Sequence, residues 1–110
     1  NSLVFDADGE PLLVMTSGRH RVDTRLLAAE LGRARIRRAT PEFVRAATGQ
    51  VIGGVAPVGH PGRLECVIDV ALAEYPELWV AGGTPHTLVP LTYAELLRIT
   101  EGREMTVAPD

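Results

Sequence analysis

The chain has 110 residues, about the length of one domain, and 45% of them are hydrophobic, which excludes a disordered or fibrous protein. Its apolar runs are far too short to cross a bilayer, so no membrane partner is expected. The formal net charge is −3, and the only cysteine, Cys66, cannot form an internal disulfide. These features fit a cytoplasmic protein, because the cytoplasm keeps thiols reduced.

The first half of the chain begins with a predicted hairpin. "NSLVF" and "PLLVMT" flank "DADGE", whose Asp and Gly favour a tight turn between two strands. Asp23 can cap a helix over residues 24–31, which Gly32 would end. After an Arg-rich strand, Thr40 and Pro41 predict the start of a second helix, over residues 41–48.

The second half reads as strands with one helix. Thr92 and Glu95 form a capping box that opens a helix over residues 93–100. Strands are expected over residues 64–72, 78–83, 86–91 and 104–108. Strands therefore outnumber helices and lack a strict βαβ alternation, so we predict an α+β fold with a mixed, partly barrel-like sheet surrounded by helices.

Basic residues are concentrated in one segment. Residues 19–45 hold eight Arg against three acidic residues, and the chain has no Lys. In "GRARIRRAT", a strand would place Arg33, Arg35 and Arg37 on one face and turn Ala34 and Ile36 toward the core. This basic stripe is either a solvated face or a contact for an anionic partner such as an RNA backbone.

The stretch "TGQVIGGVAPVGHPG", Thr48 to Gly62, has the density of glycine expected of a loop whose main chain does the work. It does not lead into a helix and holds no Lys, so it is a poor phosphate loop. The three histidines and Cys66 are scattered singly, and Cys66 lies in an apolar strand. No metal, cofactor or covalent nucleophile is therefore expected, which leaves a site built from backbone donors.

The order of several motifs carries a resemblance. "NSLVF", "DTRLLAAELG", "IGGVAP", "LECVID" and "WVAGG" follow one another as in the YbaK/prolyl-tRNA synthetase-associated domain family of aminoacyl-tRNA deacylases, which the chain resembles over nearly its whole length. The resemblance implies a single editing domain over residues 1–110. It also implies that the family's N-terminal helical segment precedes Asn1, so the chain is expected to be a piece of a longer protein.

The resemblance implies hydrolysis of a mischarged aminoacyl-tRNA, such as alanine or cysteine wrongly attached to the proline tRNA. In that case Gly53, Gly54 and Val55 are the catalytic candidates, because their backbone can approach and hold the ester carbonyl, while Ala56 and Pro57 shape the loop. The neighbouring ribose hydroxyl helps to activate water, and a small pocket selects the wrong amino acid by size. An aminoacyl-tRNA synthetase is a further candidate partner, and DNA is not one.

The resemblance also points to substrate-binding residues. They are Asn1, Ala56, Pro57, His60, Ala81, Gly82, Gly83 and His86. Many members of the family have Lys where this chain has Asn1, and some have Ser where it has Ala81, so an Arg of the basic stripe could supply the missing charge. The alternatives are a non-catalytic module that binds aminoacyl-tRNA or protein, and a plain protein-interaction domain.

Three further residues are expected to have structural roles. His20 is predicted to lie on the surface between a loop and a helix. Asp69, which ends a predicted strand, is expected to cap the following turn. Trp79 is predicted to be core or pocket wall, because a base-stacking platform ordinarily needs several exposed aromatic residues and only 5% of this chain is aromatic.

Overall fold

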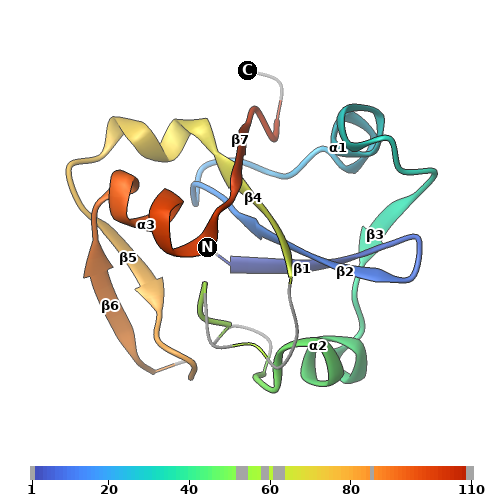
Figure 1. Cartoon of the computed structure of the whole chain (residues 1–110), viewed down its shortest axis with the longest axis horizontal. Coiled ribbons are helices and arrows are strands. Elements are labelled where there is room, and N and C mark those ends of the chain that lie inside the picture. The colour runs from blue at the N-terminus through green and yellow to red at the C-terminus, as the bar shows by residue number, and fades with distance from the viewer. Residues whose placement is uncertain (1, 52–54, 58–59, 61–63, 85, 109–110) are drawn as a thin grey trace.

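The computed structural model describes residues 2–51, 55–57, 60, 64–84 and 86–108 (Figure 1). Its strands are β1 (Ser2–Ala7), β2 (Glu10–Met15), β3 (Ile36–Arg38), β4 (Glu65–Asp69), β5 (Leu78–Ala81), β6 (Leu88–Leu91) and β7 (Arg103–Met105). Its helices are α1 (Thr24–Leu31), α2 (Pro41–Thr48), the 3-10 helix η1 (Val70–Glu74) and α3 (Tyr93–Thr100). Within the described ranges, no helix combines the length and the apolar character that a bilayer crossing requires.

The described strands form a five-stranded mixed sheet in the order β3-β1-β2-β4-β7. The strands β3, β1 and β2 are antiparallel neighbours, whereas β4 runs parallel to both β2 and β7. β5 and β6 form a separate antiparallel hairpin beside this sheet. The predicted α+β fold with a mixed sheet is therefore confirmed.

The central strand β2 is buried on both faces. Leu13 and Met15 face one core cluster, which includes Val44 of α2 and Leu96 of α3, while Leu12 and Val14 face another. Because side chains alternate along a strand, the uninterrupted apolar run of β2 supplies both clusters at once. In Figure 1, α1 lies on one side of the sheet, and α2 and the β5–β6 hairpin lie on the other.

The β5–β6 hairpin is attached by packing. Leu78 and Val80 of β5 join the cluster around Leu13 and Met15, so the second sheet wraps onto one face of the first. Its strands pair with each other, and the described ladders contain no hydrogen-bonded pairing between the two sheets. Among the described residues, the second sheet thus covers part of one face of the first through side-chain packing alone.

The predicted helix ends are confirmed by their caps. The Asp23 carboxylate accepts the backbone N–H groups of Arg25 and Leu26, and Gly32 ends the same helix with a φ of 67°. Thr92 accepts the N–H of Glu95, whose carboxylate accepts the N–H of Thr92 in return. These side-chain oxygens replace the intrahelical partners that the first turn of a helix lacks.

Several predicted strands differ from the structure in extent. Those predicted over residues 78–83, 86–91 and 104–108 are shorter, as β5, β6 and β7. The strand predicted to continue to residue 72 ends at Asp69, because its carboxylate accepts the N–H of Ala71 and turns the chain into η1. Ala34, predicted to face the core, is exposed. The exposed Asp8 carboxylate accepts the N–H groups of Ala34 and Arg35, so the regular strand begins only at Ile36.

Candidate functional site

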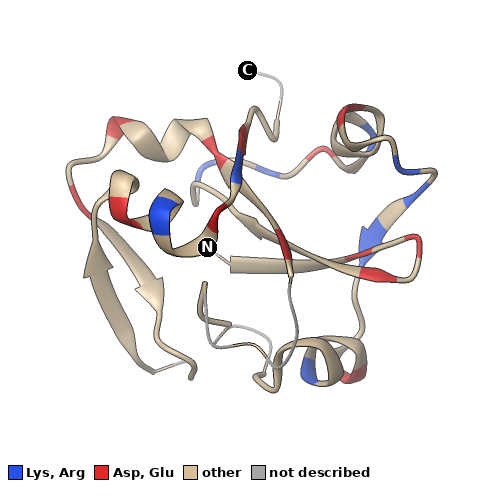
Figure 2. Ribbon diagram, viewed as in Figure 1, with Lys and Arg blue, Asp and Glu red and all other residues tan. Residues whose placement is uncertain are grey.

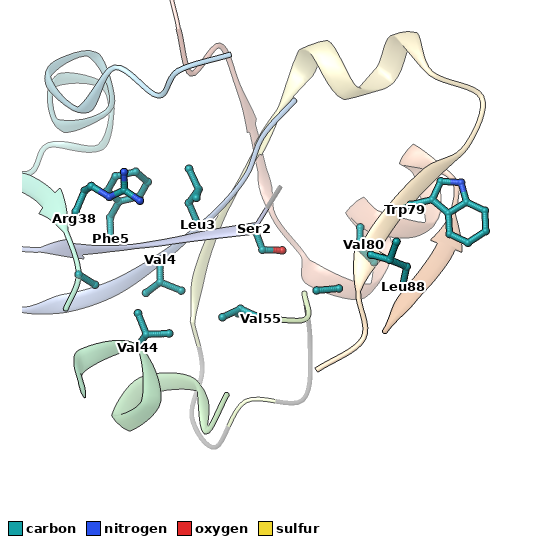
Figure 3. Close-up of a pocket in the computed structure, with 12 residues that line it drawn as sticks. Ser2, Leu3, Val4, Phe5, Arg38, Val44, Val55, Trp79, Val80 and Leu88 are labelled. Carbon is teal, nitrogen blue, oxygen red and sulfur yellow. The ribbon is translucent and has the colours of Figure 1, made fainter. Parts of the chain in front are cut away.

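A cavity of about 280 Å³ lies between the start of β1 and the β5–β6 hairpin (Figure 3). Its lining comes from five parts of the chain that are distant in sequence: Ser2, Leu3, Val4 and Phe5; Arg38 and Ala39; Val44; Val55; and Trp79, Val80, Ala81 and Leu88. Most of these side chains are aliphatic. The described lining residues include no carboxylate, so the cavity suits a small apolar group.

The glycine-rich loop reaches this cavity at Val55. Val55 is 2% exposed and lines the cavity, as does Ala81 of the "VAGG" segment. Ala56 and Pro57 are buried beside it, and the Ala56 N–H donates to Gln50 Oε1 at 2.7 Å. The Ala56 N–H is thus already used inside the protein, which fits the predicted role of this residue in shaping the loop.

The other predicted site residues are placed differently. Gly82 and Gly83 follow Ala81 in the turn of the β5–β6 hairpin, and the exposed His86 lies in the same turn. The Gly82 N–H donates to the carbonyl of Thr87 at 2.8 Å, and Gly83 has a φ of 109°, so both glycines serve the turn itself.

His60 is partly buried, and among the described residues its ring nitrogens have no hydrogen-bond partner. It does not line the cavity. Asn1, Gly53 and Gly54 lie outside the described residues, and their roles stay predictions.

Two of the three arginines of the basic stripe are neutralised by acidic neighbours. Arg33 pairs with Glu10 and with Glu65 at 3.3 Å, and Arg37 lies 3.3 Å from Asp6. Figure 2 shows this mixture of blue and red ribbon where β3 lies beside the β1–β2 hairpin. Arg38 lines the cavity, is exposed, and forms no ion pair with any residue that the structure describes. In Figure 3 its side chain lies beside Phe5, on the opposite side of β1 from Val4 and Val44, so its charge lies at the rim of the cavity.

Trp79 is part of the wall of the cavity but not of the core. It is 58% exposed, and Leu88 next to it on the hairpin is 61% exposed. In Figure 3 the indole lies at the outer side of the hairpin, beside Leu88. The prediction of a core residue is thus wrong, whereas that of a pocket wall is confirmed. Sequence gives no signal for Ser2, Ala39 or Val44, which reach the cavity only through the fold.

A second hollow, of about 480 Å³, lies away from this cavity and is lined by Cys66 and several charged residues. Burial raises the pKa of the Cys66 thiol to about 11, so the thiol stays protonated at neutral pH and is a poor nucleophile. The Arg33 side chain at this hollow is held by Glu10 and Glu65. The charges of Arg33, Glu10 and Glu65 are thus paired within the protein. The hollow is therefore a weaker candidate for a ligand-binding site than the first cavity.

Asp69 fastens three segments at the carboxyl end of β4. Its carboxylate is fully buried and accepts hydrogen bonds from Thr16 Oγ1 and the Ser17 N–H, both at 3.1 Å. It also accepts the Ala71 N–H and lies 2.8 Å from His20 Nδ1. The capping role predicted for Asp69 is confirmed. The prediction for His20 is wrong, because its side chain is only 15% exposed and packs on this carboxylate.

Asp69 should make the protein sensitive to acid. Burial alone would raise the pKa of this carboxyl, but the hydrogen bonds from Ala71, Ser17, His20 and Thr16 outweigh it and hold the pKa below its ordinary value. The stabilisation is present above the unfolded-state pKa of about 3.9 and is lost as the pH falls through the lower folded-state pKa. Urea unfolding from pH 6 to pH 2.5 should therefore show a steeper loss of stability in the wild type than in Asp69→Asn. If the free energy of unfolding fell equally with pH in both proteins, this account would be contradicted.

Comparison with known proteins agrees with this geometry. The fold and the cavity define a small α+β domain with a mostly aliphatic cavity between the start of β1 and a hairpin. The aminoacyl-tRNA editing domain family matches residues 1–99, and the chain belongs to that family. The family resemblance read from the ordered motifs is thus confirmed.

Individual relatives show the same relationship. The uncharacterised protein YwhH of Bacillus subtilis is 30% identical over 96 residues, which is 86% of this chain and 60% of YwhH. A proline–tRNA ligase of Nitratidesulfovibrio vulgaris is 36% identical over 81 residues, which is 74% of this chain and 14% of the ligase. The chain thus spans less than two thirds of the length of these curated relatives.

Solved structures agree over all or nearly all of the chain. A structure presented as a candidate trans-editing enzyme for prolyl-tRNA synthetase superposes with a TM-score of 0.91 at 40% identity, covering 100% of this chain and 69% of that one. A hypothetical protein, APE2540, superposes with a TM-score of 0.87 at 25% identity, covering 96% of this chain and 71% of that one.

Proposed function

We propose that this domain is an aminoacyl-tRNA deacylase that hydrolyses a small amino acid, such as alanine or cysteine, from a mischarged proline tRNA. The observation that supports this proposal most is that Val55 of the glycine-rich loop lines the same cavity as Ala81 of the "VAGG" segment and the start of β1. These are the motifs on which the family resemblance rests. Two relatives, a proline–tRNA ligase and a candidate trans-editing enzyme for prolyl-tRNA synthetase, support the same substrate class.

The lining of the cavity supports selection by size. Val4, Val44, Val55 and Val80 present short, branched and mostly buried side chains. A rigid aliphatic wall accepts a methyl or thiol side chain and excludes a larger one by overlap, whereas attraction alone discriminates poorly between small apolar groups. The larger amino acid that matches the tRNA would thus be excluded from the cavity, and its ester would not be hydrolysed.

The proposed reaction needs few protein side chains. A water oxygen bonds to the ester carbonyl carbon, and the bond from that carbon to the ribose oxygen breaks. The ribose oxygen takes up the proton that the water loses, and the amino acid leaves with a free carboxyl group. Backbone N–H groups of Gly53, Gly54 and Val55 stabilise the negative charge that develops on the carbonyl oxygen. The neighbouring ribose hydroxyl assists the water. The Ala56 N–H takes no part, because it is bonded to Gln50.

Arg38 is proposed to hold the terminal phosphate of the RNA. It lies at the rim of the cavity, beside Phe5, and no described acidic residue forms an ion pair with it. A guanidinium can donate two parallel hydrogen bonds to a phosphate and keeps its charge at any physiological pH. Arg38 thus supplies the charge that many relatives take from the Lys at the position of Asn1.

The test is release of amino acid from proline tRNA charged with alanine, cysteine, serine or proline. We expect turnover of a small amino acid and no turnover of proline. Arg38→Gln should lower kcat/KM at least about tenfold, which corresponds to losing one charge-assisted contact of about 1.4 kcal/mol or more. Arg35→Gln is the matched control, since Arg35 is exposed but does not line the cavity.

Two results would contradict the proposal. If no mischarged tRNA is hydrolysed although the RNA still binds, the domain is a non-catalytic aminoacyl-tRNA-binding module. If neither hydrolysis nor RNA binding occurs, the protein-interaction alternative is favoured instead.

A further inference from the structure

The cavity lies along the edges of two strands. Side chains of consecutive residues in a strand point to opposite faces of a sheet. The cavity is nevertheless lined by the consecutive residues Ser2–Phe5 of β1 and Trp79–Ala81 of β5. A run of neighbours can line one cavity when that cavity faces the strand edge, where the main chain is exposed. Peptide groups therefore form part of the lining.

The hairpin register identifies the peptide groups on the β5 side. In an antiparallel pair, the N–H and C=O of successive residues point alternately to the two edges of the strand. The Gly82 N–H bonds to Thr87 on the neighbouring strand, so Val80 also directs its N–H and C=O toward β6. Trp79 and Ala81 consequently direct theirs to the opposite edge. That edge has no ladder partner among the described residues.

The start of β1 offers a similar edge. The Asp8 N–H bonds to the carbonyl of Arg35, so Asp6 and Ser2, which share its orientation, also face the β3 side. The register with β3 covers Phe5–Ala7 only. In the described part of the chain, the main-chain groups of Ser2 on this side thus lie beyond the end of the β3 ladder.

A charged ammonium group needs hydrogen-bond acceptors, which the side chains of the cavity hardly supply. Arg38 can only donate, whereas the Ser2 hydroxyl donates to Met15 Sδ at 3.3 Å and keeps its oxygen lone pairs as acceptors. The other described lining side chains are apolar, apart from the indole N–H of Trp79, which is also only a donor. Among the described lining residues, the acceptors available there are therefore main-chain carbonyls on the open strand edges and the Ser2 hydroxyl oxygen.

We infer that the carbonyl oxygens of Trp79 and Ala81, on the open edge of β5, bind the α-ammonium group of the aminoacyl ester. This inference rests on the proposed function and deepens it. Recognition of the ammonium by the β5 edge orients the ester, while the aliphatic wall receives the amino-acid side chain. The domain thereby distinguishes an amino acid from other acyl groups of the same size.

The experiment compares three acyl groups on the same RNA. The best amino-acid substrate of the tRNA panel is tested beside its α-hydroxy acid counterpart and its N-acetyl form, for example alanyl, lactyl and N-acetylalanyl esters. Each rate is divided by the uncatalysed hydrolysis rate of the same ester, because the three differ in intrinsic lability. We expect the normalised kcat/KM of the two analogues to fall at least about tenfold, as for loss of a charge-assisted hydrogen bond.

The outcomes separate the two proposals. Equal normalised kcat/KM for the alanyl and lactyl esters would overturn recognition by the β5 edge, while hydrolysis itself would still support the deacylase. Absence of hydrolysis with every ester would overturn both.

Discussion

Replacing Ala39 with leucine is expected to lower kcat/KM for release of the amino acid about 100-fold. Ala39 lines the cavity and packs, half-buried, against the core cluster around Leu13. A leucine there extends into space that the substrate side chain would occupy and displaces the ester from the backbone donors. Misplacement of a reacting group by about 1 Å can reduce a rate by that factor. The measurement is deacylation of alanyl-tRNA under single-turnover conditions.

The matched control is Ala46→Leu. Ala46 lies on α2, is exposed and does not line the cavity, so the same change in side chain should leave kcat/KM within about twofold. Circular dichroism and urea unfolding should show that both variants are folded. Unchanged activity in a folded Ala39→Leu protein would mean that the amino acid binds elsewhere.

Replacing Asp69 with asparagine is expected to lower the free energy of unfolding by about 3 kcal/mol. The amide keeps one acceptor oxygen but turns an N–H₂ group toward donors such as Thr16 and the Ser17 N–H. Each buried polar group left without a partner costs about 1 to 3 kcal/mol. Since small domains are stable by only about 5 to 15 kcal/mol, the effect should be large in urea unfolding.

Asp8→Asn makes the same chemical change at an exposed carboxylate. Asp8 accepts the N–H groups of Ala34 and Arg35 at 2.9 Å, but water can replace these bonds, so the expected loss is below about 1 kcal/mol. Similar losses of unfolding free energy in the two variants would show that burial does not set the strength of the hydrogen bonds to Asp69.

Local signals predicted the elements well. The caps at Asp23, Thr40 and Thr92 placed all three α-helices, because a side-chain oxygen that bonds the first turn is a short-range property of the sequence. The end of β4 was missed, since a short apolar run does not distinguish a strand from a 3-10 helix. Asp69 decides that boundary by accepting the N–H of Ala71, which caps η1.

The site was predictable only in part. The ordered motifs indicated Val55 and Ala81, both of which line the cavity. They did not indicate Arg38. The alternation of Arg in the Arg-rich segment predicts a shared face, but it does not predict which arginines form ion pairs with acidic residues. Arg33 and Arg37 do meet them, through strand pairing that brings Glu10, Glu65 and Asp6 alongside. A charge left available at a cavity is a property of the whole fold.

The position of β2 also has a consequence for the order of events during folding. The β1–β2 hairpin can form early in synthesis, yet Leu12 pairs with Glu65 and Met15 with Ile68, in a strand that is made much later. Until then one edge of β2 is unpaired, and its two apolar faces have only the part of their native cover that α1 and α2 supply. Such long-range parallel pairing slows folding, and it prolongs the time during which apolar surface is exposed and can aggregate. The same strand that joins the two cores thus makes the nascent chain depend on its second half for solubility.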